Sequence, residues 1–162
     1  MCPLSKPPSF PGDETVLVRP YSDRDFAEVS LLESDSVHEP YRSAVFVRQM
    51  GALFPHTFLV AVVGETVVGF TVGSIVQDGS ASAWVLRVMV KDGYRHRRVG
   101  TRLLSTVIES LVARSITTIY LTVSPQNLPA IRLYTTAGFV RVDEIREYFG
   151  PGEDRYVMKR EG

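Results

Sequence analysis

The chain has 162 residues with 18 basic and 18 acidic side chains, so its formal net charge is zero. This balance disfavours a nucleic-acid partner, because nucleic-acid-binding domains carry a basic excess. An apolar content of 44% and a charged content of 22% are ordinary for a soluble globular protein. We expect one domain over residues 15–162, preceded by a mobile, proline-rich tail over residues 1–14.

Cysteine usage and hydropathy narrow the class further. Cys2 is the single cysteine, which excludes an internal disulfide and a thiolate-rich metal site. The first residues lack the apolar core of a signal peptide, and no apolar run approaches the length of a membrane span. We therefore expect a cytoplasmic protein with neither a metal nor a membrane partner.

The first half of the chain predicts one strand, two helices and a group of strands. Ser22 is expected to cap the first helix, which continues through Leu32. The polar, acidic segment Glu33–Pro40 is expected to be a loop, and a second helix follows around Phe46. The expected strands are residues 15–19, 57–63, 66–75 and 83–90, three of them joined by hairpin turns.

The second half predicts alternating helices and strands. After Gly100 the apolar residues recur at helical spacing as far as Val112. A helix thus joins the strand ending at Val90 to the next strand, residues 117–123, so these two strands should run parallel. Asn127 opens a short helix that ends at Gly138. The last antiparallel pair is expected over residues 140–149 and 154–159.

A basic turn stands between the strand ending at Val90 and the helix after Gly100. The start of a helix leaves backbone N–H groups free, and its macrodipole adds partial positive charge there. Five basic residues surround this start: Arg95, His96, Arg97, Arg98 and Arg102. The turn therefore predicts a site for a phosphate or pyrophosphate, with a solvated basic face as the alternative.

Two motifs in this chain resemble those of the GNAT superfamily of N-acetyltransferases. Arg95, Val99 and Gly100 match its acetyl-CoA-binding turn, R/Q-x-x-G-x-G/A. Arg98 stands in place of the first glycine of that turn, so we expect an ordinary backbone angle there, with the side chain turned away or onto a phosphate. The segment Asn127–Phe139 resembles the family's N-x-x-A-x-x-L/F-Y-x-x-x-G-F.

The resemblance covers residues 15–160 and implies the GNAT fold. This α/β fold has a mixed, mostly antiparallel sheet with two splayed central parallel strands and helices on both faces. The pantetheine arm of acetyl-CoA, the co-substrate, lies between the splayed strands. The implied cofactor-binding residues are Val88, Met89, Val90, Arg95, His96, Arg97, Arg98, Val99, Gly100, Thr101, Asn127 and Tyr134.

Tyr134 is the catalytic residue that the resemblance implies. The resemblance places the phenol of Tyr134 near the thioester sulfur, where it would protonate the departing thiolate. Backbone N–H groups near Met89 and Val90 would stabilise the thioester oxygen. The alternative is that Tyr134 packs beside Phe139 and that Asn127 is a plain N-cap.

The general base is missing from both central strands, because residues 82–90 and 117–123 contain no Asp, Glu or His. Many relatives carry a carboxylate there. The candidates elsewhere are Glu33, Asp35, His38, Glu39, Glu144, Glu147 and Tyr148, and a water relay is a further alternative.

The substrate class has two indications. The segment Tyr148–Asp154 resembles the ending of the amino-terminal acetyltransferase branch, which acts on peptide N-termini. The segment Thr122–Asn127 resembles diaminobutyrate acetyltransferases, which modify a small amine. We expect an acyltransferase acting on the α-amine of a peptide or amino acid. A small-amine acetyltransferase and a non-catalytic acyl-CoA-binding module are the alternatives, and a homodimer is left open.

Overall fold

The computed structural model describes residues 15–162, and the expected tail over residues 1–14, with Cys2, lies outside the described residues. In this part of the chain seven strands form one sheet in the order β1-β2-β3-β4-β5-β7-β6. The strands are β1 (Val16–Pro20), β2 (Phe58–Val63), β3 (Thr66–Ile75), β4 (Ser82–Val90), β5 (Thr118–Val123), β6 (Val140–Ile145) and β7 (Arg155–Glu161). Neighbouring strands are antiparallel, except for the parallel pair β4 and β5. The mixed, mostly antiparallel sheet is confirmed.

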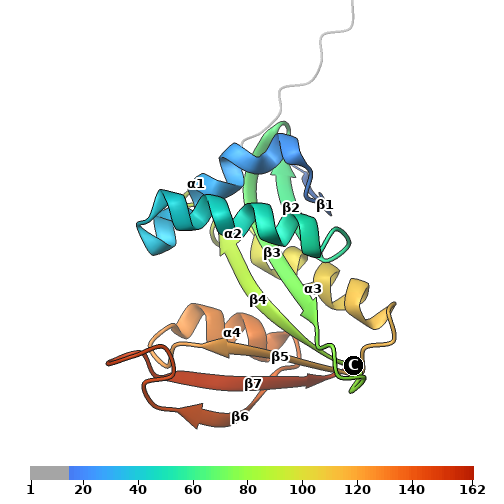
Figure 1. Ribbon diagram of the computed structural model, residues 1–162, viewed down its shortest axis with the longest axis vertical. Coiled ribbons are helices and arrows are strands. Elements are labelled where there is room, and N and C mark those ends of the chain that lie inside the picture. The colour runs from blue at the N-terminus through green and yellow to red at the C-terminus, as the bar shows by residue number, and fades with distance from the viewer. Residues whose placement is uncertain (1–14) are drawn as a thin grey trace, which may run out of the picture.

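Helices cover both faces of this sheet (Figure 1). The four α-helices of the described residues are α1 (Phe26–Val37), α2 (Pro40–Leu53), α3 (Val99–Val112) and α4 (Leu128–Thr136), and a 3₁₀ turn, Asp23–Asp25, precedes α1. Side chains alternate between the faces of a strand. In β2, Phe58 and Val60 accordingly pack with α1 and α2, whereas Leu59 and Ala61 pack with α3. Two apolar layers result, one on each face.

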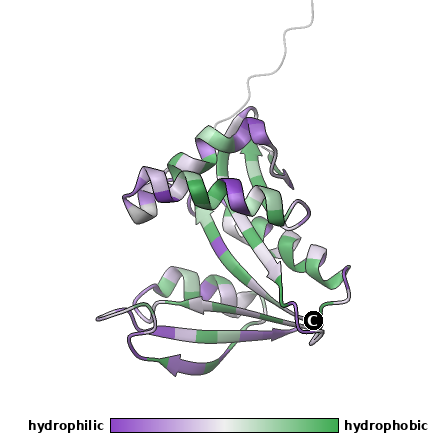
Figure 2. Ribbon diagram, viewed as in Figure 1, coloured by the Kyte–Doolittle hydropathy of each residue, from purple (hydrophilic) through white to green (hydrophobic). Residues whose placement is uncertain are grey.

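Helix α3 lies directly on β3 because that strand presents glycine to it. A Cβ atom at Gly73 would stand 2.9 Å from Val107 Cγ2, closer than real side chains approach. Figure 2 shows apolar colouring along β2 and β3, between the helix layers, and hydrophilic colouring along the edge strand β6. Among residues 15–162, no helix has the length and apolarity needed to cross a membrane.

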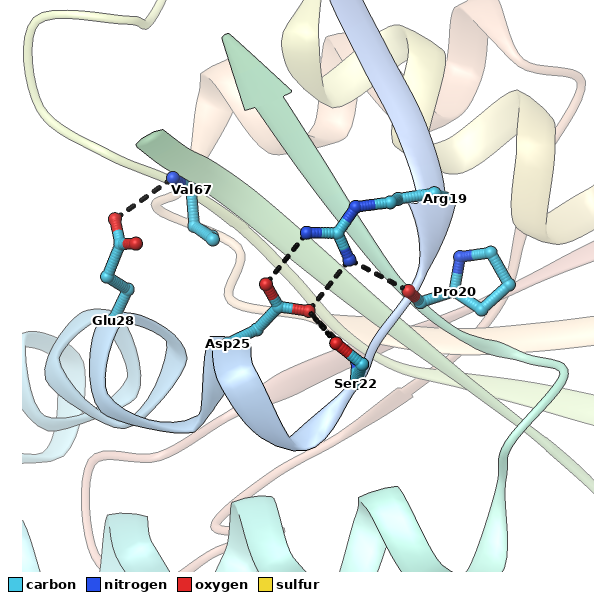
Figure 3. A network of polar contacts seen from close by, with 6 residues as sticks. All are labelled: Arg19, Pro20, Ser22, Asp25, Glu28 and Val67. Atoms are coloured by element: carbon cyan, nitrogen blue, oxygen red, sulfur yellow. Dashed lines mark hydrogen bonds and ion pairs between the residues drawn. The ribbon is translucent and has the colours of Figure 1, made fainter. Parts of the chain in front are cut away.

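The start of α1 is tied to the sheet by a polar network (Figure 3). Two guanidinium nitrogens of Arg19, on β1, each donate to an oxygen of Asp25 at 2.8 Å. The Ser22 N–H donates to the same carboxylate at 2.9 Å. One turn further on, Glu28 accepts a hydrogen bond from the Val67 N–H of β3 at 3.0 Å. Burial alone would raise the pKa of Asp25, but the hydrogen bonds from Arg19 and Ser22 outweigh it and lower that pKa.

Two sequence predictions about element boundaries are wrong. The segment Glu33–Pro40 is not a loop, because α1 continues to Val37 and α2 begins at Pro40. Polarity suggested a loop, but Glu33 is buried and paired with an arginine of the sheet. The strand predicted over residues 140–149 ends at Ile145, and residues 146–154 form a turn-rich connection to β7.

Candidate functional site

The two parallel strands separate after a short paired stretch. Pairing joins Ser82, Ala83 and Trp84 of β4 to Thr118, Ile119 and Tyr120 of β5, and no further. The rings of Trp84 and Tyr120 stack at the last pair, with centroids 5.2 Å apart. Beyond it, β4 and β5 diverge (Figure 1). The splay that the family resemblance implied is confirmed, and Val85–Val90 and Leu121–Val123 are called the splayed segments below.

A β-bulge at Leu86 changes the direction of the side chains in β4. Gly73 of β3 pairs with Val85, but the preceding Val72 pairs with Arg87, so Leu86 is an extra residue. After the bulge, Val88 packs in the apolar layer of α3 and α4. Met89 packs in the layer of α1 and α2. The backbone between these two residues therefore runs between the two faces of the sheet, just beyond the point of separation.

The predicted anion site lies at the start of α3. The N–H groups of Val99, Gly100 and Thr101 precede the first hydrogen bond of the helix, from Arg102 N–H to the Arg98 carbonyl at 3.0 Å. The Arg98 side chain does not cap the helix. These N–H groups thus point at a position where an anion would be stabilised by the helix dipole.

The backbone of Arg98 contradicts the expectation of an ordinary angle. Its φ is 62° and that of His96 is 63°, both in the left-handed region. This conformation costs a residue with a Cβ atom about 1–2 kcal/mol. The turn therefore adopts at Arg98 a left-handed backbone that glycine tolerates more easily than arginine.

Basic side chains surround the start of α3. Arg98 and His96 are exposed, and Arg97 stands over the Tyr94 ring at 5.2 Å. Arg95 makes an exposed ion pair with Asp92, at 3.3 Å from Nη2 to Oδ1. An exposed pair of this kind is worth little, so Arg95 can turn to a stronger anion.

Gly100 connects this turn to the splayed segments. A Cβ atom there would lie 3.3 Å from Leu133 Cδ2 of α4 and 3.7 Å from Val90 Cγ2 of β4. The first turn of α3 thus lies between β4 and α4. Beside it, Thr101, Arg132 and Leu133 help to line a groove of about 490 Å³ between α3 and α4.

Tyr134 lies on α4 and packs against β5. It is 9% exposed and belongs to the apolar cluster that holds Leu121 and Val123 of β5, against which Val88 packs. Its ring meets that of Phe139 edge-on, with centroids 6.1 Å apart. Within the described part of the chain its hydroxyl makes no hydrogen bond. Burial raises the pKa of Tyr134 to about 12, so the phenol keeps its proton at neutral pH.

Asn127 caps α4, because its Oδ1 accepts a hydrogen bond from the Ala130 N–H at 3.2 Å. Capping occupies the amide oxygen and leaves the NH₂ group for another partner.

The candidate bases are dispersed. Asp35, His38, Glu39, Glu144, Glu147 and Tyr148 are exposed. Glu39 is paired with Arg42 at 2.7 Å. Among the described candidates, Glu33 is the one that pairs with a residue of β4, at 3.2 Å from Oε1 to Arg87 Nε. Burial raises the pKa of Glu33, although the charge of Arg87 lowers it in part.

Sequence reasoning did not single out Arg87, which lies in the splayed segment of β4 and pairs with Glu33. The signal was a lone charged residue within the apolar run of β4. Elsewhere, residues 15–162 contain no group of three or more His, Cys, Asp or Glu side chains placed to hold a metal ion.

Comparisons with known proteins agree with this geometry. Residues 22–139 match the model of the acetyltransferase (GNAT) family. The chain is 30% identical over 145 residues to an N-alpha-acetyltransferase of Sulfurisphaera tokodaii, which covers 83% of this chain and 86% of that relative. It is 27% identical over 124 residues to an L-2,4-diaminobutyric acid acetyltransferase of Nocardia farcinica, covering 74% of this chain and 62% of that relative. The crystal structure of Ard1 from Thermoplasma volcanium matches with a TM-score of 0.79 at 28% identity, covering 90% of this chain and 97% of that one.

The chain belongs to the GNAT family of acetyltransferases. It is therefore an enzyme, an N-acetyltransferase, and the resemblance of its two motifs is confirmed.

Proposed function

We propose that this enzyme transfers the acetyl group of acetyl-CoA to the α-amine of a peptide N-terminus or of an amino acid. One observation carries the choice of amine. The splayed segments of β4 and β5 present no Asp, Glu or His to a reacting amine, and the buried Glu33 is engaged with Arg87. An acceptor must therefore arrive with little need of a general base.

Three parts of acetyl-CoA would each meet residues of this site. The pyrophosphate would lie at Arg95–Thr101, on the free N–H groups of α3 and among the arginines. The pantetheine arm would pass Gly100 and the Asn127 amide into the space between the splayed segments. The thioester oxygen would accept hydrogen bonds from N–H groups near Met89 and Val90.

Acetyl transfer then needs one proton donor and one proton acceptor. The amine nitrogen attacks the thioester carbon, a C–N bond forms, and the C–S bond breaks. The Tyr134 hydroxyl protonates the departing thiolate and recovers its proton from solvent, whereas the amine gives its proton to water. The raised pKa of Tyr134 supports this role, because a general acid must be protonated when the reaction begins.

The ordinary pKa values of amines then favour the α-amine. The α-amino group at a peptide N-terminus has a pKa near ~8, whereas a lysine amine has one near ~10.4. At neutral pH about a tenth of the former is uncharged, against less than about a thousandth of the latter. A site without a base on its central strands favours the amine that is already uncharged.

Two further observations bear on the acceptor. The rings of Tyr148 and Phe149, 4.8 Å apart and exposed before β7, resemble the aromatic ending of the amino-terminal acetyltransferase branch. The N-alpha-acetyltransferase relative supports the same class. The diaminobutyric acid acetyltransferase relative favours a second candidate, a small diamine carrying a carboxylate.

Release of CoA can be followed with a panel of acceptors. The panel contains a lysine-free peptide with a free N-terminus, an N-blocked peptide with one lysine, 2,4-diaminobutyrate and a polyamine. We expect the highest kcat/KM for an α-amine acceptor. A higher value for the blocked lysine peptide or the polyamine would contradict the proposal, and CoA binding without turnover would indicate a non-catalytic module.

A further inference from the structure

Arg87 is the only charged residue of β4, and three contacts hold its guanidinium group. Nε donates to the buried Glu33 carboxylate at 3.2 Å, and Nη1 donates to the Leu86 carbonyl at the bulge at 3.1 Å. The group lies 5.3 Å from the centre of the Phe46 ring of α2. Contacts with α1, with α2 and with the bulge of β4 therefore fix its orientation, while its side chain is still 40% exposed.

These contacts leave one nitrogen of the guanidinium group free. Among the side chains that the structure describes, Nη2 of Arg87 has no hydrogen-bond partner. The pair Arg19–Asp25 shows the alternative, because there two nitrogens each meet a carboxylate oxygen at 2.8 Å. The Arg87 pair uses one nitrogen and one oxygen, and Glu33 Oε2 is buried without a partner. A pair that served only to fasten α1 to the sheet would be more stable in the two-bonded form.

The position of Arg87 relative to the site gives that free nitrogen a role. Arg87 immediately precedes Val88 and Met89, whose backbone lies just beyond the point where β4 and β5 separate. Its partners Glu33 and Phe46 belong to α1 and α2, whereas Tyr134 and the start of α3 lie on the opposite face. Acetyl-CoA would enter from the face of α3 and α4, so the acceptor must approach from the face that carries Arg87.

We propose that Arg87 binds a carboxylate of the acceptor and so selects amines that carry an acidic group close to the reacting nitrogen. This inference rests on the proposed acetylation of α-amines and defines their class more narrowly. The unengaged Nη2 can donate a charge-assisted hydrogen bond to such a carboxylate. Glu33 and Phe46 hold the group in advance, which lowers the entropic cost of binding. Arg87 would then bridge two carboxylates, that of Glu33 and that of the acceptor.

The acceptor carboxylate could come from two sources, the side chain of a peptide's first residue or the α-carboxylate of a free amino acid. Matched acceptors distinguish them. A peptide beginning with Glu is compared with the same peptide beginning with Gln, and glutamine is compared with glutaminamide. Each kcat/KM is corrected for the pKa of its own amine. In at least one pair, we expect the member with the additional carboxylate to have a kcat/KM about 10- to 100-fold higher, the range of a charged hydrogen bond. The favoured pair identifies the source.

Variants connect the preference to Arg87. Arg87→Met combined with Glu33→Gln removes the charge without leaving a buried, unpaired carboxylate, and it should abolish the preference mainly through KM for the acidic acceptor. Arg48→Met is the matched control, because Arg48 also lies over a phenylalanine, Phe26, at 3.6 Å and near an aspartate, but these partners belong to α1 and the preceding 3₁₀ turn and not to β4. The control should keep the full preference. If the double variant fails to fold, Arg87→Lys is used, which keeps the charge and loses the planar fork.

Equal rates for acidic and neutral acceptors in the wild type would overturn this inference and leave the proposed function intact. The same holds if the preference survives removal of Arg87. Absence of turnover with every acceptor would instead contradict the proposed function, and the inference with it.

Discussion

The indole ring of Trp84 stacks on the phenol ring of Tyr120 at a centroid distance of 5.2 Å, at the last residue pair that joins the two parallel strands. Up to this pair, β4 and β5 form an ordinary ladder. Beyond it, β4 contains the bulge at Leu86, and the strands separate. The stack therefore marks the point from which the splayed segments diverge.

Removal of the indole should destabilise the protein at this point. Trp84→Ala is expected to lower the free energy of unfolding by about 1–3 kcal/mol, because it removes the stack and part of the apolar burial. Trp84→Phe keeps a ring on Tyr120 and should lose less. Chemical denaturation of the two variants measures the difference, and equal losses would show that stacking contributes nothing here.

Two buried carboxylates should respond oppositely to pH. The pKa of Asp25 is lowered, so its contribution to stability is present above the ordinary aspartate value of about 3.9 and is lost as the pH falls through the lowered value. Asp25→Asn should therefore cost about 1.5–3 kcal/mol at neutral pH. Thermal unfolding at pH 7 measures this, and an unchanged Tm would contradict it.

The contribution of Glu33 to stability should change with pH in the opposite direction. Burial raises its pKa, so its contribution is present below the ordinary glutamate value of about 4.3 and is lost as the pH rises through the raised value. The difference between the Tm of Glu33→Gln and that of the wild type should consequently shift in favour of the variant as the pH rises from about 4 towards 7. A variant that loses stability relative to the wild type over this window would show that the pairing with Arg87 outweighs burial.

Arg98 should be a site where glycine improves stability. Arg98→Gly relieves the left-handed backbone strain and should raise the free energy of unfolding by about 1 kcal/mol relative to Arg98→Ala, which keeps it. Both variants lose the positive charge and should bind CoA more weakly than the wild type. Denaturation and CoA titration separate these effects. If Arg98→Gly were less stable than Arg98→Ala, the backbone at this position would not be strained.

Tyr134→Phe removes the hydroxyl and preserves the ring. Because Tyr134 keeps its proton until a pH of about 12, its burial favours folding below about pH 10, and this contribution is lost between pH 10 and 12. The Tyr134→Phe variant should not show that loss of stability at alkaline pH.

The kcat of Tyr134→Phe should fall about 10²-fold, the lower end for general acids, because a thiolate leaves readily. An unchanged kcat with chemistry rate-limiting would refute the role in catalysis.

The sequence correctly predicted those features of the fold that depend on local residue patterns. The helical spacing after Gly100, the N-cap at Asn127 and the parallel pairing across α3 all follow from residues close to one another in the chain. Family motifs supplied the splay, which periodicity does not reveal.

Predictions failed where a distant partner decides the outcome. Glu33 is helical and buried because Arg87, 54 residues away, pairs with it. Arg98 adopts a left-handed backbone because the turn as a whole needs that shape, not because arginine prefers it. The bulge at Leu86, which turns Arg87 towards α1, has no local sequence signal such as glycine.

One peptide tests the central claim most directly. It carries a free α-amine, an acidic first residue and a single internal lysine, and after incubation with acetyl-CoA and the enzyme the acetyl group is located by fragmentation mass spectrometry. Both amines share one molecule, so concentration and purity affect them equally. The account predicts acetylation of the α-amine nitrogen. Acetylation mainly at the lysine Nζ would contradict it.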